Sequence, residues 1–291
     1  MRLASTKSLA AVAVSALTFG LASQASGITI VRTFIAPGQT FPGIGGTAGS
    51  ASAFQAGGGD LQTVFNAAAD WWEAAILDPH VVTVNFGWDA LPTFAAFHNL
   101  LAQGGTPNRE TVGLVRFDND PSTTWYTDPS PLSTSADTEY STFTPYSADL
   151  GGGLMNVGRE YTGARGPAAG RLDMMTVALH EVGHALGLSF ENTSFPAETA
   201  DGDIDVTAPL PFAGAAIPIG GGDHLDLLRA TMFPNLPLGT RKILSEADIL
   251  ANAQLSQFTN VNLNPVPEPG SLIALGIGVA ALAACRRRRK A

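Results

Sequence analysis

The sequence predicts a single α+β domain flanked by two terminal segments of different character. Stretches rich in β-branched residues and stretches with a helical spacing of apolar residues occur in mixed order along the chain. No internal repeat and no second domain is visible in the sequence. Residues 26–264 form the predicted domain, and a chain of this length can bury a substantial core.

Residues 1–25 have the three parts of a secretory signal peptide. Two basic residues precede an apolar run at 9–21, and small residues follow that run. The run has about 13 residues, which is fewer than the roughly 20 that a membrane-spanning helix needs. We therefore predict a secreted protein whose signal peptide is cleaved after Ala25 or after Gly27.

Residues 265–291 combine a Pro-Glu-Pro group, an apolar stretch and a basic end. The apolar stretch runs from Leu272 to Cys285, and five basic residues follow it. As a helix it would be about 21 Å long, which is short for a hydrocarbon core of about 30 Å. One interpretation is a transmembrane tail anchor with its positive cluster on the inside.

The order of these three parts resembles the PEP-CTERM sorting signal. The resemblance implies a Gram-negative bacterium and only transient contact of this segment with the membrane. It also implies an exosortase-type sorting protease as a partner. That protease would remove the segment and deliver the protein to the cell surface or the extracellular matrix.

Charge and cysteine content restrict the kinds of partner and of covalent cross-link that residues 26–264 can have. This stretch has 9 basic and 24 acidic residues, a net charge of −15. Such an acidic body repels phosphate backbones, so we expect no nucleic acid partner. The only cysteine, Cys285, lies in the terminal segment, so the body can form no disulfide. Its stability must come from a core and from bound metals.

The first half of the body predicts strands around one long helix. Asp60 is the predicted N-cap of a helix that runs to about Leu77. Residues 36–59 and 118–150 are rich in small and polar residues and predict loops, the second of a length that is typical of a substrate cleft. The predicted strands are 28–35, 81–88, 111–117 and 154–161.

The next predicted helix carries a metal-binding pattern. It begins after Asp173, a predicted N-cap, and ends near Gly187. His180 and His184 are four residues apart, so their imidazoles lie on one helix face and can bind one Zn²⁺. Glu181, beside the first histidine, can accept a proton from a metal-bound water without being a ligand itself.

Two other interpretations of this pattern are open. The first is a pair of satisfied core histidines beside an exposed glutamate, but that would place two polar rings on an apolar helix face at a considerable cost. The second is a non-catalytic surface or extracellular-matrix binding protein that zinc merely stabilises. Structural zinc sites usually have four protein ligands and favour cysteine, which the body lacks. The pattern therefore favours a catalytic zinc.

The stretch from His180 to Gly187 resembles the zincin metallopeptidases, and more closely the metzincin pattern H-E-x-x-H-x-x-G-x-x-H. Residues 230–234 resemble the Met-turn of that clan, and residues 244–249 resemble the start of its C-terminal helix. The resemblance implies a twisted, mostly parallel sheet with an active-site helix and a C-terminal helix. It also implies a zinc endopeptidase that cuts peptide or protein substrates. Residues 154–161 could be the edge strand along which such a peptide lies.

The third zinc ligand departs from this pattern, because Phe190 stands where metzincins carry their last histidine. His224 is the only histidine after the motif, and it follows three glycines that could bring the backbone close. We therefore predict His224 as the third metal ligand. Glu191 and Glu198 are alternatives, but their spacing from His184 is short for a second helix to return. The aspartates at 201, 203 and 205 could also reach the metal, but they suit calcium or water better.

Several other polar residues have open roles. Asp201, Asp203 and Asp205 could bind Ca²⁺ or form a solvated acidic loop. Asp223 or Asp226 could orient a ligating imidazole. A donor for the transition-state oxyanion is not identified, and Tyr161 is one candidate. His80 and His98 are more typical of surface or capped histidines than of ligands.

Overall fold

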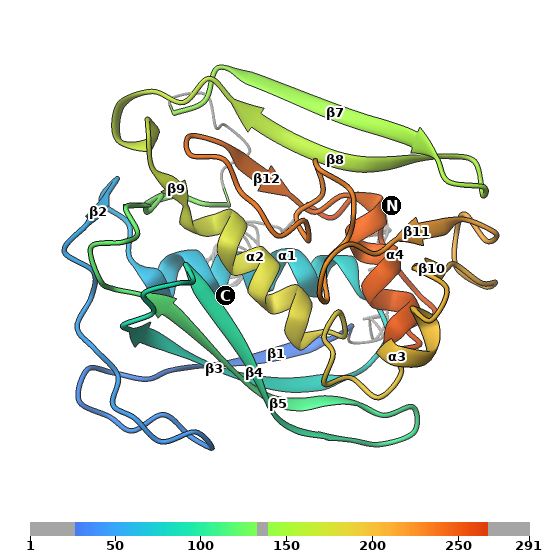
Figure 1. Cartoon of the computed structure of the whole chain (residues 1–291), viewed down its shortest axis with the longest axis horizontal. Helices are drawn as coiled ribbons and strands as arrows, with labels where there is room; N and C mark the ends of the chain where they lie inside the picture. Colours follow the sequence, from blue (N-terminus) through green and yellow to red (C-terminus); the bar gives the residue numbers. More distant parts are fainter. Residues whose placement is uncertain (1–26, 133–138, 267–291) are drawn as a thin grey trace, which may run out of the picture.

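Figure 1 shows a computed structural model of the chain, which describes residues 27–132 and 139–266. The predicted signal peptide, and all but the first two residues of the predicted sorting segment, lie outside the described residues. Within the described ranges, no helix is both long and apolar enough to cross a membrane.

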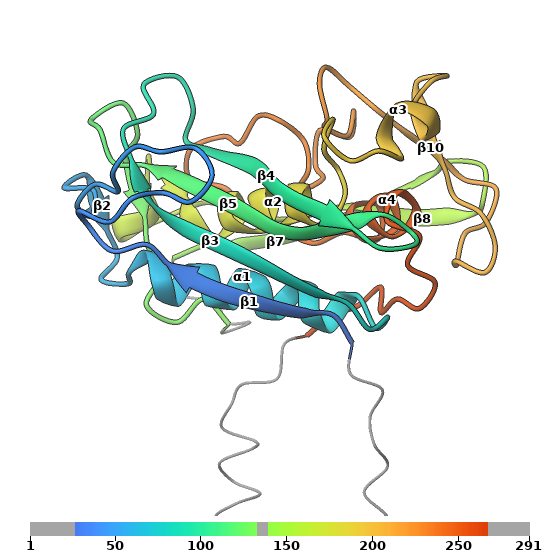
Figure 2. The same ribbon diagram turned by 90° about the horizontal axis from the view of Figure 1, so that it is seen from below.

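A four-stranded sheet forms one layer of the fold (Figure 2). Its strand order is β1-β3-β5-β4, in which the first three strands run parallel and β4 pairs antiparallel with β5 at the edge. The bounds are β1 Thr29–Phe34, β3 Val81–Asp89, β4 Ala96–Gly104 and β5 Arg109–Asp118. This sheet confirms the mostly parallel α+β fold and the first three predicted strands.

The edge strand β4 was missed by the sequence analysis. Its first three residues are buried, exposed and buried, the other six are all half-buried, and its register with β5 is irregular around Leu100 and Ala102. Such a strand has little of the period-two pattern that predicts a strand from sequence. β4 nevertheless supplies one wall of the functional site described below.

The prediction that residues 154–161 form a substrate-binding edge strand is wrong. β8 (Leu154–Thr162) is the central strand of a second, antiparallel sheet, between β12 (Arg241–Ile243) and β7 (Thr142–Asp149). Both of its edges are therefore occupied by neighbouring strands. β7 lies within residues 118–150, which the sequence analysis predicted to be a loop. Its Ser, Thr and Pro residues are exposed or half-buried, so the composition of this segment did not indicate a strand.

Two helices cover one face of the four-stranded sheet (Figures 1 and 2). The first, α1 (Leu61–Ala75), is capped by Asp60 as predicted, since the Asp60 carboxylate accepts from the Thr63 backbone N–H at 2.7 Å. It packs against α2 (Met174–Ala185), the helix with the metal-binding pattern. The indole N–H of Trp72 donates to the Leu179 carbonyl at 2.9 Å and joins the two helices inside the core.

The remaining elements are short, apart from the last helix. α4 (Glu246–Leu255) follows its N-cap Ser245, which forms a capping box with Asp248. The helix starts within residues 244–249, the segment that resembles the start of the C-terminal helix of metzincins. The others are β2 Gln55–Ala56, β6 Trp125–Tyr126, η1 Gly166–Ala168, β9 Leu172–Asp173, α3 Phe195–Glu198, β10 Asp203–Asp205 and β11 Ala216–Pro218.

Candidate active site

The N-terminus of α2 is held by a buried charge. The Asp173 carboxylate accepts from the Thr176 backbone N–H at 2.9 Å, as an N-cap does. The guanidinium of Arg241, on β12, donates to the same carboxylate from Nε at 3.0 Å and from Nη2 at 2.9 Å. The start of the helix is thereby joined to the second sheet.

The helix ends where the sequence predicted. Gly187 follows the last helical turn with a φ of 142°, a conformation that favours glycine. A side chain at this position would also collide with Ser256, which follows α4. The chain turns sharply here, and the carbonyl of Leu188 comes back to the ring of His184.

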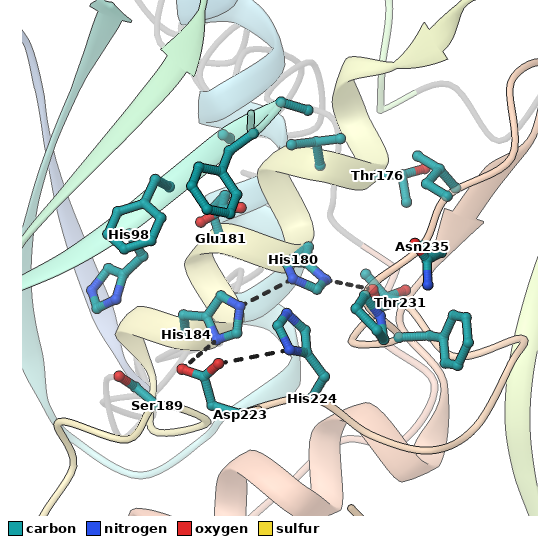
Figure 3. A pocket seen from close by; sticks show the side chains of 18 of the residues that line it. His98, Thr176, His180, Glu181, His184, Ser189, Asp223, His224, Thr231 and Asn235 are labelled. Carbon is teal, nitrogen blue, oxygen red and sulfur yellow. Dashed lines mark hydrogen bonds and ion pairs between the residues drawn. The ribbon is translucent and has the colours of Figure 1, made fainter. Parts of the chain in front are cut away.

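Two backbone carbonyls orient the histidines of α2. Nδ1 of His180 donates to the Thr231 carbonyl at 2.9 Å, and Nδ1 of His184 contacts the Leu188 carbonyl. A carbonyl only accepts, so Nδ1 carries the proton in a neutral ring and Nε2 is left with a lone pair. The two Nε2 atoms are 3.0 Å apart (Figure 3). Two lone pairs this close repel each other, and a bound cation would remove that repulsion.

His224 completes a cluster of three imidazoles. It lies in the loop between β11 and β12, and its ring centre is 5.0 Å from that of His180 and 5.1 Å from that of His184. One nitrogen of each ring lies within 4.8 Å of the others. Ligands bound tetrahedrally to Zn²⁺ at about 2.0–2.1 Å would be about 3.3 Å apart, so small shifts of the three rings would accommodate the ion. The role of these residues as zinc ligands remains a prediction.

Burial keeps the three imidazoles neutral. Desolvation lowers the pKa of His180 well below its ordinary value and also lowers the pKa of His184 and of His224. Asp223 lies beside the cluster, with carboxylate oxygens 3.7 Å from Nδ1 of His224 and 3.9 Å from Nδ1 of His184. Neutral rings with a carboxylate behind them suit a bound divalent cation.

Glu181 is buried beside the cluster and lines the same cavity. Burial, together with the negative charge of Asp223, raises the pKa of its carboxyl to about 8, while a hydrogen bond from the backbone N–H of His98 acts in the opposite direction. A metal ion nearby would favour the ionised form and bring this pKa down. The carboxyl is thus placed to take up and release a proton near neutral pH.

The turn around Met232 packs against α2 and positions a backbone carbonyl beside the histidine cluster. Met232 is fully buried, and its sulfur packs against the backbone of α2 at Gly183. The Asp248 carboxylate accepts from the Thr231 N–H at 3.1 Å and from the Met232 N–H at 2.9 Å. This arrangement fixes the Thr231 carbonyl that orients His180, and it agrees with the resemblance of this segment to a Met-turn.

A cavity of about 780 Å³ opens in front of the histidines. β4 forms one wall through Phe97, His98 and Asn99. His98 lies outside the metal cluster, because its Nε2 is bonded to the buried Glu110 carboxyl at 2.9 Å. His80 does not line the cavity, and its Nε2 contacts the Glu110 carbonyl at 2.7 Å.

The alternative ligands are not members of the histidine cluster, although Glu191 also lines the cavity. The Glu191 carboxylate accepts from the Leu100 backbone N–H at 2.8 Å, and Glu198 contacts Gln254 at 3.5 Å. Asp226 and Tyr161 do not line the cavity. Tyr161 packs in a separate aromatic cluster with its ring centre 4.7 Å from that of Phe143, so the suggestion that it stabilises an oxyanion is wrong.

The three aspartates after α3 form a second group with converging oxygens. One oxygen each of Asp201, Asp203 and Asp205 lies within 4.8 Å of the others, and two of these residues are exposed. Exposed acidic groups of this kind also occur without an ion. Calcium binding at this position remains a prediction.

Comparison with known families gives two matches. A family model described as Matrixin matches residues 36–195, which is more than half of the chain. A model described as PEP-CTERM protein-sorting motif matches residues 265–289. Searches of curated proteins and of solved structures found no match. The Matrixin match ends at residue 195, before His224 and Met232. The positions of these two residues beside α2 therefore support a metallopeptidase site independently of the match.

Proposed function

We propose that this chain, which belongs to the matrixin family of metalloendopeptidases, cuts protein substrates outside the cell with a catalytic zinc. The observation that carries the proposal is the geometry of the histidine cluster. His180 and His184 direct two Nε2 atoms at each other across 3.0 Å, and a nitrogen of His224 lies within 4.8 Å of both rings' ligand atoms. Its PEP-CTERM motif is that of an exosortase-sorted cell-surface protein.

The residues that would hold the zinc are His180, His184 and His224. Three protein ligands are the number that catalytic zinc sites use, with a further position left for water or substrate. Zinc bound there would lower the pKa of a coordinated water to about 7 and polarise the scissile carbonyl. The cavity in front of the rings gives a peptide access to this position.

Glu181 is the proposed general base. Its carboxylate would accept the proton of the attacking water and pass it to the leaving amine. The edge strand β4 lines the cavity and pairs only with β5, so its other edge can bind an extended peptide by backbone hydrogen bonds. β4 takes the place that the sequence analysis gave to residues 154–161.

The alternative is a non-catalytic surface or matrix-binding protein in which zinc stabilises the fold. A structural zinc site is closed by its ligands. Here the cluster faces a cavity, and a buried glutamate lines that cavity beside it. A structural zinc would need neither feature, so the enzyme is favoured.

The zinc affinity of two histidine variants tests the ligand assignment. We expect His224→Ala to lose at least about tenfold in zinc affinity, because it removes one of three ligands. His98→Ala, which removes a cavity histidine outside the cluster, should bind zinc like the wild type. Equal affinity of the two variants would give the third position to an acidic residue.

Deletion of residues 265–291 tests the sorting signal. The body ends before this segment, where Nη2 of Arg159 donates to the Leu263 carbonyl at 3.0 Å and to the Asn264 side chain at 2.8 Å. The deletion should therefore leave peptide hydrolysis intact and remove the protein from its sorting route. Mass spectrometry of the mature surface protein provides the counter-test, because an intact basic end would indicate a permanent anchor instead.

A further inference from the structure

We infer that Lys242 selects substrates with an acidic side chain beside the scissile bond, an inference that rests on the proposed function. The first observation is that the cavity has two unlike walls. Figure 3 shows His98 and Glu181 on one side of the three histidines and Thr176, Thr231 and Asn235 on the other.

Two of the three acidic residues that line the cavity follow this division, and the third, Asp223, lies beside the histidines. Glu181 lies on the β4 side, and the Glu191 carboxylate is bonded to β4. Among the described residues that line the cavity, Lys242 is the only lysine or arginine. It belongs to the opposite wall, because its backbone N–H donates to the Thr176 hydroxyl at 2.8 Å and its Nζ lies 5.2 Å from the ring centre of Phe233.

Within the described residues, the ammonium group of Lys242 has two hydrogen-bond acceptors for its three donors. Nζ donates to the Leu228 carbonyl at 2.8 Å and to the Ala230 carbonyl at 3.2 Å, which uses two of the three N–H bonds of an ammonium. Only 1% of Lys242 is exposed, so bulk water hydrates its third N–H poorly. On the same wall the hydroxyl of Thr231 is buried and has no partner within the described residues.

A carboxylate of the substrate is complementary to the Lys242 ammonium and the Thr231 hydroxyl. It accepts hydrogen bonds and carries the charge opposite to the ammonium, whereas an amide of the same shape brings no charge. The folded protein has already desolvated the lysine, so the entering carboxylate must offset only its own loss of water. Glu160, the nearest cross-strand carboxylate, is bonded to Arg229 at 2.7 Å and leaves the lysine available.

Paired peptides test this selectivity with the zinc-loaded full chain. Cleavage sites in a peptide mixture are first mapped by mass spectrometry, and Asp or Glu should be enriched beside the scissile bond. Peptides that differ only by Glu or Gln at that position should then differ at least about tenfold in kcat/KM. Equal kcat/KM for the two peptides would overturn the inference. Lys242 would then only stabilise the segment before Met232 through its hydrogen bonds to Leu228 and Ala230.

Three variants separate charge from packing. Lys242→Arg should keep the preference for Glu, and Lys242→Met should bring the ratio of kcat/KM values close to one. Arg165→Met is the matched control, since it removes one positive charge from an exposed residue outside the cavity. A Lys242→Met protein that still prefers Glu as strongly as the control would contradict the inference.

Peptide binding provides a readout that does not depend on turnover. The Glu181→Gln protein should bind the Glu peptide at least about tenfold more tightly than the Gln peptide in calorimetry, and Lys242→Met in the same protein should remove this difference. Equal affinities for the two peptides in the Glu181→Gln protein would refute the role of Lys242. Absence of hydrolysis by the wild type, with the difference in affinity retained, would instead refute the proposed catalysis alone.

Discussion

Replacement of Asp173 should destabilise the protein far more than replacement of an ordinary helix cap. Its carboxylate accepts five hydrogen bonds, from the backbone and hydroxyl of Thr176, from Tyr140 at 2.9 Å, and twice from Arg241. Although burial by itself lowers the pKa of Arg241, Asp173 and Asp128 raise it above its ordinary value. The guanidinium therefore remains charged inside the protein.

The magnitude follows from two parts. Loss of an N-cap costs about 1 kcal/mol, and breaking a buried ion pair from one side costs about 3–5 kcal/mol. We expect Asp173→Ala to lose about 4–6 kcal/mol of unfolding free energy. Asp60→Ala is the control, because Asp60 caps α1 at an exposed position where no buried cation depends on it. Its expected loss is about 1 kcal/mol.

Urea unfolding of the zinc-loaded protein measures both values. Trp72 and Trp125 are fully buried and report the loss of the core by their fluorescence. With a slope of about 2–3 kcal/mol per molar urea, Asp173→Ala should lower the midpoint by about 2 M and Asp60→Ala by about 0.4 M. Equal shifts for the two variants would refute the claim that the buried charge pair fixes the start of α2.

Two further predictions concern the packing and the protonation of the site. Gly183→Ala should cost about 1–3 kcal/mol of unfolding free energy, because the added methyl group meets Met232 and lies 3.2 Å from Trp72. Gly104→Ala, where nothing lies within 4 Å, should change stability by less than about 0.5 kcal/mol, and calorimetry compares the two. Zinc release, followed with a chromophoric chelator as pH falls, should have its midpoint below pH 6.5, because burial lowers the pKa of His180 and His184 from that value and protons compete with the metal only when the rings accept them. A midpoint above pH 6.5 would show that the cluster is not desolvated as described.

The local parts of the site could be predicted from the sequence. His180, Glu181 and His184 depend only on the geometry of one helix, and Asp173 is recognisable as its cap. His224 lies 40 residues beyond His184, and it was found by elimination, since no other histidine follows the motif. Its approach to the other two rings depends on the tertiary fold.

Other parts depend on contacts that a single sequence does not reveal. β4 forms because β5 pairs with it, and its own residues predict little. The partner strands that enclose β8 come from before and after it in the chain, so the free edge expected there does not exist. In the sequence Lys242 is one basic residue in a short segment. Only the tertiary fold shows that it lies in the wall of the cavity.

The zinc content and hydrolytic activity of Glu181→Gln test the central claim most directly. The substitution keeps the size of a buried side chain that lines the cavity but is no member of the histidine cluster. The wild type and the variant should both bind about one zinc per chain, while peptide hydrolysis falls by about 10²–10⁴-fold in the variant. Hydrolysis within a few-fold of the wild type, or folded wild-type protein that binds no zinc, would contradict the account.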